Sequence, residues 1–196
     1  TGGALYGEPD VVPAEEGHPV RPLSPYGTAK YCFEQYLGTF HRTFGLNFTV
    51  LRYANIYGAR QDFQSEEGRV VAIFASRMLA GQQLTIDGDG EQSRDMLHVS
   101  DCATANLAAL DRGDGGTYHV STATLVTVND LFRKLANLTG YTAQAAHGPR
   151  RQGDVYRISL DNTHAREELG WEPRISLEEG LSLTVDYFRE RVATTQ

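Results

Sequence analysis

The feature that most constrains the fold is a long stretch of helix-forming sequence bounded by Ser24 and Gly45. Ser24 can cap a helix N-terminus, Pro25 suits the first helical position, and Gly45 suits the residue just past the end. The large apolar side chains of this stretch recur at helical spacing, at Phe33, Leu37, Phe40 and Phe44. The next segment, 47–53 (NFTVLRY), is typical of a strand. The pattern predicts an amphipathic helix that leads directly into a strand.

Similar start and stop signals recur along the rest of the chain. We expect helices over 70–80, from Ser100 or Asp101 to 112, and over 127–138, 161–169 and 177–191, and strands over 84–86 and 117–120. Alternating helices and strands predict an α/β fold with a mainly parallel sheet. Residues 8–25 hold five of the seven prolines, which indicates a long irregular loop.

Composition excludes several classes of protein. The net charge is −7, and no basic cluster is interleaved with aromatic residues, so we expect no nucleic-acid partner. The longest apolar run, 70–75, is far too short to span a membrane. Cys32 and Cys102 fit no metal or redox spacing, and we expect both to be buried thiols in a reducing compartment such as the cytoplasm.

The strongest chemical signal is the run Ser24–Lys30 (SPYGTAK). Tyr26 and Lys30 are four residues apart on the expected helix, so their side chains lie on one face, one turn apart. A phenol normally titrates near pH 10, and a nearby ammonium group stabilises the phenolate. The pair can therefore work as a general acid and base. The alternative is an ordinary surface pair on an amphipathic helix, although ten Tyr and two Lys would give only about 0.1 such matches by chance.

Other common site motifs fail. The run that begins Asp87-Gly88-Asp89 lacks the glycine and glutamate that a calcium loop requires at its sixth and twelfth positions. No zinc-binding histidine pair, nucleophile elbow or Walker loop is present, and Gly2, Gly3 and Gly7 do not form a dinucleotide-binding turn. We therefore expect no metal site in this chain.

Blocks of sequence in a fixed order resemble the extended short-chain dehydrogenase/reductase family, and within it most nearly the UDP-glucose 4-epimerases. The blocks are Thr1–Glu8 (TGGALYGE), Tyr26 with Lys30, Leu51–Gly58 (LRYANIYG), Ser93–Asp101 (SRDMLHVSD), Arg151–Asp154 (RQGD) and Gly170–Pro173 (GWEP). The resemblance implies that 1–57 and 92–122 are the remainder of a Rossmann-like, NAD-binding domain. It implies that 58–91 and 123–196 form a smaller mixed α/β domain that binds the nucleotide-sugar.

The resemblance also implies roles for individual residues. Tyr26 would take the proton from the sugar 4-hydroxyl, while Lys30 would hold the nicotinamide ribose of NAD and stabilise the Tyr26 phenolate. Thr1 is the only hydroxyl available before Tyr6 to position the 4-oxygen. Tyr53 would contribute to the cofactor site.

On the substrate side, the resemblance assigns contacts with UDP. Arg94 and Arg151 would pair with phosphate oxygens, for which a forked guanidinium is suited. Further expected contacts are Asn55 with the diphosphate, Asp154 with a ribose hydroxyl, Thr85 and Asp87 along the uracil, and Val71. Ile158 occupies the position at which the family admits or excludes an N-acetyl group. A homodimer through the helix that carries Tyr26 is also implied, with Tyr31 and Tyr36 on its exposed side.

One departure from the family is large. A dinucleotide-binding half needs a strand, a glycine turn and a helix N-terminus, and this sequence offers none of these in combination. In the family they precede the block at Thr1, so we expect that this chain alone neither binds NAD tightly nor turns over. A dehydratase or decarboxylase is the alternative enzyme, although Gly2-Gly3 stand where a dehydratase carries an acidic pair. A non-catalytic nucleotide-sugar-binding module is the third possibility.

Overall fold

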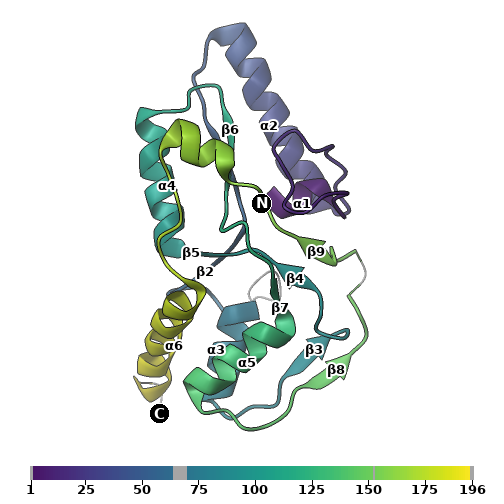
Figure 1. Cartoon of the computed structure of the whole chain (residues 1–196), viewed down its shortest axis with the longest axis vertical. Coiled ribbons are helices and arrows are strands. Elements are labelled where there is room, and N and C mark those ends of the chain that lie inside the picture. Colours follow the sequence, from purple (N-terminus) through teal and green to yellow (C-terminus); the bar gives the residue numbers. More distant parts are fainter. Residues whose placement is uncertain (1, 64–69, 152, 195–196) are drawn as a thin grey trace.

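The computed structural model describes residues 2–63, 70–151 and 153–194 of the 196-residue chain. Figure 1 shows an elongated molecule, with a long helix at one end, a cluster of helices at the other and strands between them. The helices are α1 (Gly2–Tyr6), α2 (Pro25–Phe44), α3 (Val70–Leu79), α4 (Val99–Asp111), α5 (Val128–Thr139), η1 (Ala165–Leu169) and α6 (Leu177–Thr194). The strands are β1 (Val50–Tyr53), β2 (Asn55–Tyr57), β3 (Thr85–Asp87), β4 (Ser93–Arg94), β5 (Met96–His98), β6 (Thr117–Val120), β7 (Val126–Thr127), β8 (Ala146–Gly148) and β9 (Arg157–Ile158).

Most strand pairs are parallel, as the alternating pattern predicted. Strand β1 pairs with β6, β2 with β5 and β3 with β8, all in parallel. Strand β4 lies between β9, to which it is parallel, and β7, to which it is antiparallel. The α/β class with mainly parallel pairing is therefore confirmed.

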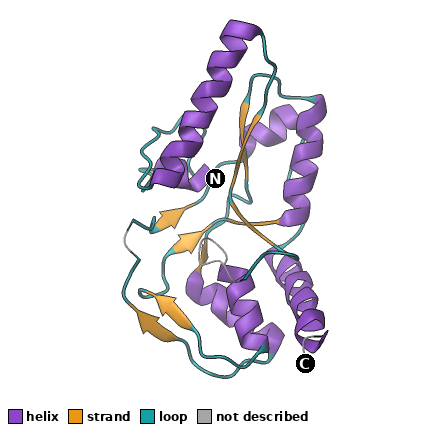
Figure 2. Cartoon of the chain, turned by 180° about the vertical axis from the view of Figure 1, so that it is seen from behind, coloured by secondary structure: helices purple, strands orange, loops and turns teal. Residues whose placement is uncertain are grey.

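Helices α2 and α4 lie on opposite sides of the β1–β6 pair, as both views show (Figures 1 and 2). Successive side chains of a strand point to opposite faces. Arg52 of β1 accordingly reaches Glu34 on α2, whereas the hydroxyl of the next residue, Tyr53, donates to Asn106 on α4. Neighbouring side chains of β1 thus contact the helices on opposite sides of the β1–β6 pair.

Apolar side chains gather in three clusters. The largest joins α3, α5 and α6 around fully buried residues such as Leu135 and Leu181. A second packs α4 and η1 against β6 and includes the buried Trp171. The third lies around Leu5 and Tyr6 of α1 and includes Ile158 and Leu160. The third cluster holds α1, which follows directly on Thr1, against β9.

The residues that the sequence predicted to cap the ends of helices do so in the structure. The Ser24 hydroxyl oxygen accepts from the Gly27 N–H at 3.1 Å, and Gly45 ends α2 in the left-handed region at φ 69°. Thr127 caps α5 and Ser176 caps α6, each through its hydroxyl oxygen. Side-chain capping of this kind satisfies the unpaired N–H groups of a helix start.

Several expectations were wrong in detail. Helix α4 begins at Val99 and is capped by His98 rather than by Ser100 or Asp101, because the His98 ring nitrogen accepts from the Ser100 N–H. The short helix expected over 161–169 is present from 163 and ends at Gly170 as predicted, but its segment Ala165–Leu169 is a π-helix, η1. Cys32 is exposed and Cys102 is only half-buried, so neither is a core thiol. Tyr31 packs into the third cluster instead of lying fully exposed beside Tyr36.

Short elements escaped prediction altogether. Helix α1 and strands β2, β4, β5, β7, β8 and β9 have at most five residues each, too few for a periodic pattern to develop. In the described part of the chain, no helix is both long enough and apolar enough to cross a membrane.

Candidate functional site

The N-terminal turn of α2 presents two open polar groups. Tyr26 is 55% exposed, and the Lys30 ammonium nitrogen lies 5.4 Å from the centre of its ring. The residues at 2–63, 70–151 and 153–194 offer neither the Tyr26 hydroxyl nor the Lys30 ammonium a hydrogen-bond partner. The predicted one-face arrangement of the pair is therefore present, with both groups available to another molecule.

A glycine brings this turn close to the first sequence block. A Cβ at Gly27 would lie 2.4 Å from the Ala4 carbonyl oxygen, which no side chain could tolerate. Because Gly27 permits this contact, α1 and the start of α2 touch and Tyr26 stays next to the block that follows Thr1. Thr1, the residue expected to position the 4-oxygen, lies outside the described residues.

Arg94 and Asp154 are joined directly. The Arg94 Nη2 lies 2.6 Å from Asp154 Oδ1, and Nη1 donates to the Ser93 and Tyr156 carbonyls at 2.9 and 3.3 Å. The Arg94 side chain is 15% exposed and that of Asp154 40% exposed. A guanidinium has five N–H donors, and these contacts engage only part of them. Arg94 is thus held in one orientation and still has donors for an anion.

The segment around Asp154 lies next to the start of α2. A Cβ at Gly153 would lie 3.8 Å from the carbonyl oxygen of Leu23, the residue before the α2 cap. Glu8, from the first block, accepts from the Tyr156 N–H and lies 3.5 Å from the Arg150 guanidinium. These contacts bring the block at 151–154 beside the turn that carries Tyr26, although the two are far apart in sequence.

The other predicted contact residues have varied surroundings. Asn55 opens β2 and is half-buried, with its N–H bound to the Asp95 carbonyl at 2.9 Å. Thr85 and Asp87 are exposed on the same side of β3, and Arg151 is exposed. The side chain of Val71, in contrast, is buried in the α3–α5–α6 cluster.

Tyr53, expected near the cofactor, faces away from α2. Its hydroxyl donates to Asn106 of α4 at 3.0 Å, and burial raises its pKa to about 12. Ile158 is buried against α1, where a Cβ at Gly3 would lie 3.0 Å from its Cγ1. The structure therefore places Ile158 next to the first sequence block, at Gly3, whereas the Tyr53 side chain points away towards α4.

Sequence reading missed a buried polar network behind this site. Arg52 forms a forked ion pair with Glu34 of α2, with Nη2–Oε2 at 2.6 Å and Nε–Oε1 at 3.1 Å. Its Nη1 donates to the Tyr6 hydroxyl oxygen at 2.5 Å, and that hydroxyl contacts His119 Nε2 at 2.6 Å. The sequence around Arg52 did not indicate this role, because the periodic pattern of a strand identifies a buried position but not its polar partners.

The protonation of this network follows from its partners. His119 Nδ1 faces the Asp161 carbonyl, which can only accept, so Nδ1 carries the proton and Nε2 accepts from Tyr6. Burial lowers the pKa of His119 to about 4 and raises that of Tyr6 to about 12. The Glu16 carboxylate, 3.8 Å from Nδ1, therefore faces a neutral ring at pH 7, and accepts instead from the His119 backbone N–H.

Asp95 is a second buried polar centre that the sequence did not reveal. Its carboxylate accepts from the Thr122 N–H and hydroxyl at 2.9 and 2.7 Å and from the Ser159 hydroxyl at 3.1 Å. Burial raises the pKa of this carboxyl, whereas these hydrogen bonds oppose the rise. Asp95 ties together the segments after β4, β6 and β9 and so supports the position of Arg94.

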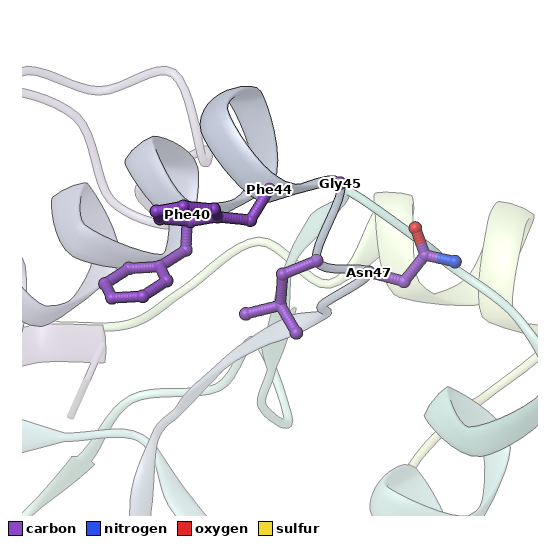
Figure 3. Close-up of a pocket in the computed structure, with 5 residues that line it drawn as sticks. Phe40, Phe44, Gly45 and Asn47 are labelled. Carbon is purple, nitrogen blue, oxygen red and sulfur yellow. The ribbon is translucent and has the colours of Figure 1, made fainter.

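A surface hollow of about 620 Å³ lies at the other end of α2, and its lining is drawn in Figure 3. Phe40, Phe44, Gly45, Leu46 and Asn47 line it. None of these side chains titrates, and Phe44 is about 27 Å along the helix from Tyr26 at a rise of about 1.5 Å per residue. The hollow is therefore unsuited to the chemistry of the Tyr26/Lys30 pair.

Comparison with known proteins shows the family of this chain. The sequence profile described as "NAD dependent epimerase/dehydratase family" matches residues 1–121. A UDP-glucose 4-epimerase of Mycolicibacterium smegmatis is 39% identical over 192 residues, covering 97% of this chain and 61% of that protein. A dTDP-glucose 4,6-dehydratase of Streptomyces niveus is 35% identical over 181 residues, covering 91% of this chain and 53% of that protein.

Two solved structures resemble this chain over almost its whole length. The UDP-glucose 4-epimerase of Thermotoga maritima with UDP-glucose superposes with a TM-score of 0.96 at 52% identity, covering 98% of this chain and 62% of that one. The Thermus thermophilus UDP-glucose 4-epimerase in complex with NAD gives a TM-score of 0.90 at 40% identity, covering 96% and 62%. This chain spans less than two thirds of the length of each of these proteins. Its fold is that of part of the Rossmann-like epimerases.

Proposed function

Because this chain belongs to the NAD-dependent epimerase/dehydratase family, we propose that it is part of an enzyme that inverts carbon 4 of a UDP-sugar of the UDP-glucose/UDP-galactose type. The observation that carries the proposal is the open Tyr26/Lys30 pair, together with the Arg94–Asp154 ion pair, whose Asp154 follows a glycine that lies next to Leu23 at the start of α2. The first suits proton transfer and the second suits a diphosphate. A 4-keto sugar is the intermediate of the proposed reaction.

The proton steps fall to α2. Tyr26 takes the proton of the sugar 4-hydroxyl as the 4-keto sugar forms, and returns it when the alcohol is restored. The Lys30 ammonium lies on the same face of the helix, 5.4 Å from the centre of the Tyr26 ring. Thr1 is proposed to orient the 4-oxygen. A general acid and base must lie within hydrogen-bond reach of the proton it moves, and the exposed Tyr26 hydroxyl is open to such an approach.

The proposed cofactor is NAD, which when bound accepts a hydride from carbon 4 and gives it back. Lys30 and Tyr26 fit the ribose at its nicotinamide end, because both present polar groups on one helix turn that have no hydrogen-bond partner among the described residues. Tyr53 belongs to the cofactor site in our proposal through its backbone, since its hydroxyl is bound to Asn106. Further residues of a longer product would hold most of NAD. The incomplete coverage of the relatives supports this division.

The substrate side is proposed as follows. Arg94 and Arg151 bind the diphosphate together with Asn55, and Asp154 accepts from a ribose hydroxyl while it orients Arg94. Thr85 and Asp87 run along the uracil, and Val71 contributes from α3 through its backbone, because its side chain is in the core. We propose that residues 58–91 and 123–196 form this nucleotide-sugar domain and that 1–57 and 92–122 belong to the cofactor domain.

Two other functions remain alternatives. A sugar-nucleotide dehydratase or decarboxylase shares the oxidation at carbon 4, and a dehydratase is among the relatives at 35% identity. Gly2 and Gly3 disfavour elimination, because they carry no acid to assist it. A non-catalytic nucleotide-sugar-binding module would need neither Tyr26 nor Lys30 to be open.

We also propose a homodimer of a cytoplasmic enzyme in galactose metabolism. The outer face of α2 supports the dimer, because Phe33 and Phe44 on it are 61% and 73% exposed. Large apolar side chains grouped on one exposed face commonly mark an interface.

The test is product analysis with the longer gene product that contains this chain. Purified protein is incubated with UDP-glucose without added cofactor, and the nucleotide-sugars are separated by chromatography. We expect UDP-galactose to form until a fixed ratio is reached. A 4-keto-6-deoxy sugar would move the assignment to a dehydratase, and UDP binding without any conversion would favour the non-catalytic module. A parallel incubation with UDP-glucuronic acid tests the decarboxylase, because only a sugar with a carboxylate at carbon 6 can release CO2 and leave a pentose.

A further inference from the structure

Helix α2 is held to the rest of the chain in an unusual way. Gly27 is the only one of its residues that is buried among those described. A surface helix normally binds its neighbours by burying an apolar stripe. Here Phe33, Phe40 and Phe44 are exposed, and Tyr31 is only partly buried against the third cluster. Apolar burial alone therefore does not fix the orientation of α2, and other contacts must contribute.

A forked ion pair supplies the strongest of these contacts. The Arg52 and Glu34 side chains are 9% and 13% exposed, and two hydrogen bonds join them, at 2.6 and 3.1 Å. Two-point contacts of this kind fix direction as well as distance. Glu34 lies one turn beyond Lys30 on α2, so the fork holds the helix immediately behind the reactive pair.

The third nitrogen of the same guanidinium, Nη1, contacts Tyr6 in the first sequence block. Arg52 Nη1 donates to the Tyr6 hydroxyl oxygen at 2.5 Å and to the Glu16 carbonyl at 3.3 Å. Tyr6 ends α1 and in turn donates to His119 of β6. One side chain therefore links α2, α1 and the loop at 8–25 to the β1–β6 pair.

A buried ion pair of this kind contributes little net free energy to the stability of the fold. Burying an ion pair costs desolvation free energy that its attraction often does no more than offset, and an apolar pair of similar size is commonly as stable. Unlike an apolar pair, the forked ion pair fixes the rotation of α2 about its axis and its position along that axis. Those are the two quantities that decide where Tyr26 and Lys30 point.

We propose that Arg52 is a positioning residue for the Tyr26/Lys30 pair, which it orients through its fork to Glu34 and its hydrogen bond to Tyr6. The proposal rests on the proposed function, since it assigns to Arg52 the aim of the proton-transferring helix. Arg94, Asp154 and Asn55 lie outside α2, so binding of the UDP moiety does not depend on this aim.

The test uses the longer gene product and the change Arg52→Lys, which keeps the charge and loses the fork. We expect kcat to fall about 10- to 100-fold, because a shift of about 1 Å in a reacting group can cost on the order of 100-fold. The Kd for UDP, measured by titration calorimetry, should stay within about twofold and the number of UDP sites per chain should not change. Arg42→Lys is the matched control, because Arg42 is an exposed α2 residue whose guanidinium contacts only Thr39 of the same helix among described residues.

Hydrogen exchange gives a readout that does not depend on turnover. In Arg52→Lys, amides of α2 should exchange faster while those of α5 keep their wild-type rates, because α5 belongs to a different cluster. Glu34→Gln removes one charge with little change in shape, and it should give the same pattern with a smaller loss of kcat. It replaces the first variant if Arg52→Lys does not fold.

The outcomes separate the two proposals. Unchanged kcat in Arg52→Lys, or a UDP affinity that falls in parallel with kcat, would overturn the positioning role. Loss of UDP sites per chain would indicate that Arg52 only stabilises the fold. If the wild type converts no nucleotide-sugar, the proposed function fails. In that case, hydrogen exchange of the α2 amides that is unchanged in Arg52→Lys would overturn the positioning role of Arg52 independently.

Discussion

Helices α2 and α5 are both amphipathic, yet this chain uses their apolar faces in opposite ways. Helix α5 buries Leu131 and Leu135 against α3 and α6, whereas α2 buries Gly27 and leaves Phe33 and Phe44 exposed. Non-directional apolar contact supplies stability to α5. Directional polar contacts and a close glycine approach supply orientation to α2. The difference indicates that the apolar stability of the chain and the orientation of the proposed Tyr26/Lys30 site are located in separate parts of the molecule.

The largest effect that this division predicts is on turnover. Tyr26→Phe removes the proton-carrying oxygen, and we expect kcat of the longer product to fall by about 10²–10⁴-fold, which is the usual contribution of a general acid or base. The Kd for the UDP-sugar and the midpoint of thermal unfolding should hardly change, because the ring remains and the hydroxyl has no partner within the described residues. Steady-state kinetics and calorimetry measure both.

Tyr36→Phe is the matched control for that experiment. Tyr36 lies on the same helix and is 66% exposed, so loss of its hydroxyl should leave kcat unchanged. Equal losses in the two variants, or a proportional loss of substrate affinity in Tyr26→Phe, would contradict the role of Tyr26 as the base.

A smaller but substantial effect is expected in the helix cluster at the other end. Leu135 is fully buried between α3, α5 and α6, and Leu135→Ala should lower the free energy of unfolding by about 2–5 kcal/mol. Urea denaturation of the chain measures this, with Leu107→Ala, at an exposed position of α4, as the control. A cost below about 1 kcal/mol would mean that this cluster does not carry the stability.

The polar network behind α2 should make stability depend on pH. Burial holds the pKa of His119 at about 4, below its ordinary value of 6.5, so the unfolded chain takes up a proton before the folded one. Stability from this group is complete above about pH 6.5 and decreases as the pH falls towards 4, by about 3 kcal/mol in all. His119→Gln should be less stable at pH 7 and lose that slope. An identical slope in both proteins between pH 6.5 and 4 would show that another group is responsible.

The smallest effect is expected on the outer face of α2. Phe33→Ser should change the free energy of unfolding of this chain by less than about 0.5 kcal/mol, because the side chain is 61% exposed. In the longer product, sedimentation should detect weaker self-association if this face forms the dimer. A large loss of stability in the chain itself would show that α2 is held by its apolar face after all.

The predictability of the two regions from sequence also differs. The bounds of α2, α5 and α6 follow from Ser24, Thr127 and Ser176, because caps and terminating glycines are local signals. The one-face geometry of Tyr26 and Lys30 follows from helical spacing alone. Family resemblance correctly indicated the epimerase/dehydratase fold, and it drew attention to Arg94 and Asp154, which the structure joins.

Other features depend on contacts between distant residues, which no local pattern encodes. The sequence predicted only that Arg52 lies in a strand, whereas its partners Glu34, Tyr6 and Glu16 come from three other segments. His98 caps α4 only because β5 ends there. The orientation of Tyr53 likewise depends on which helix covers each side of β1. Such properties arise when the chain folds, and one-dimensional periodicity cannot predict them.

The most direct test of the central claim follows the hydrogen at carbon 4 of the sugar. UDP-glucose carrying deuterium at that carbon is incubated with the longer product, and the UDP-galactose formed is analysed by mass spectrometry and NMR. Epimerisation through a 4-keto sugar at the Tyr26 site predicts that the label is found again at carbon 4, with inverted configuration and no exchange with water. Label lost to solvent, or recovered at carbon 6 of a deoxy sugar, would contradict it.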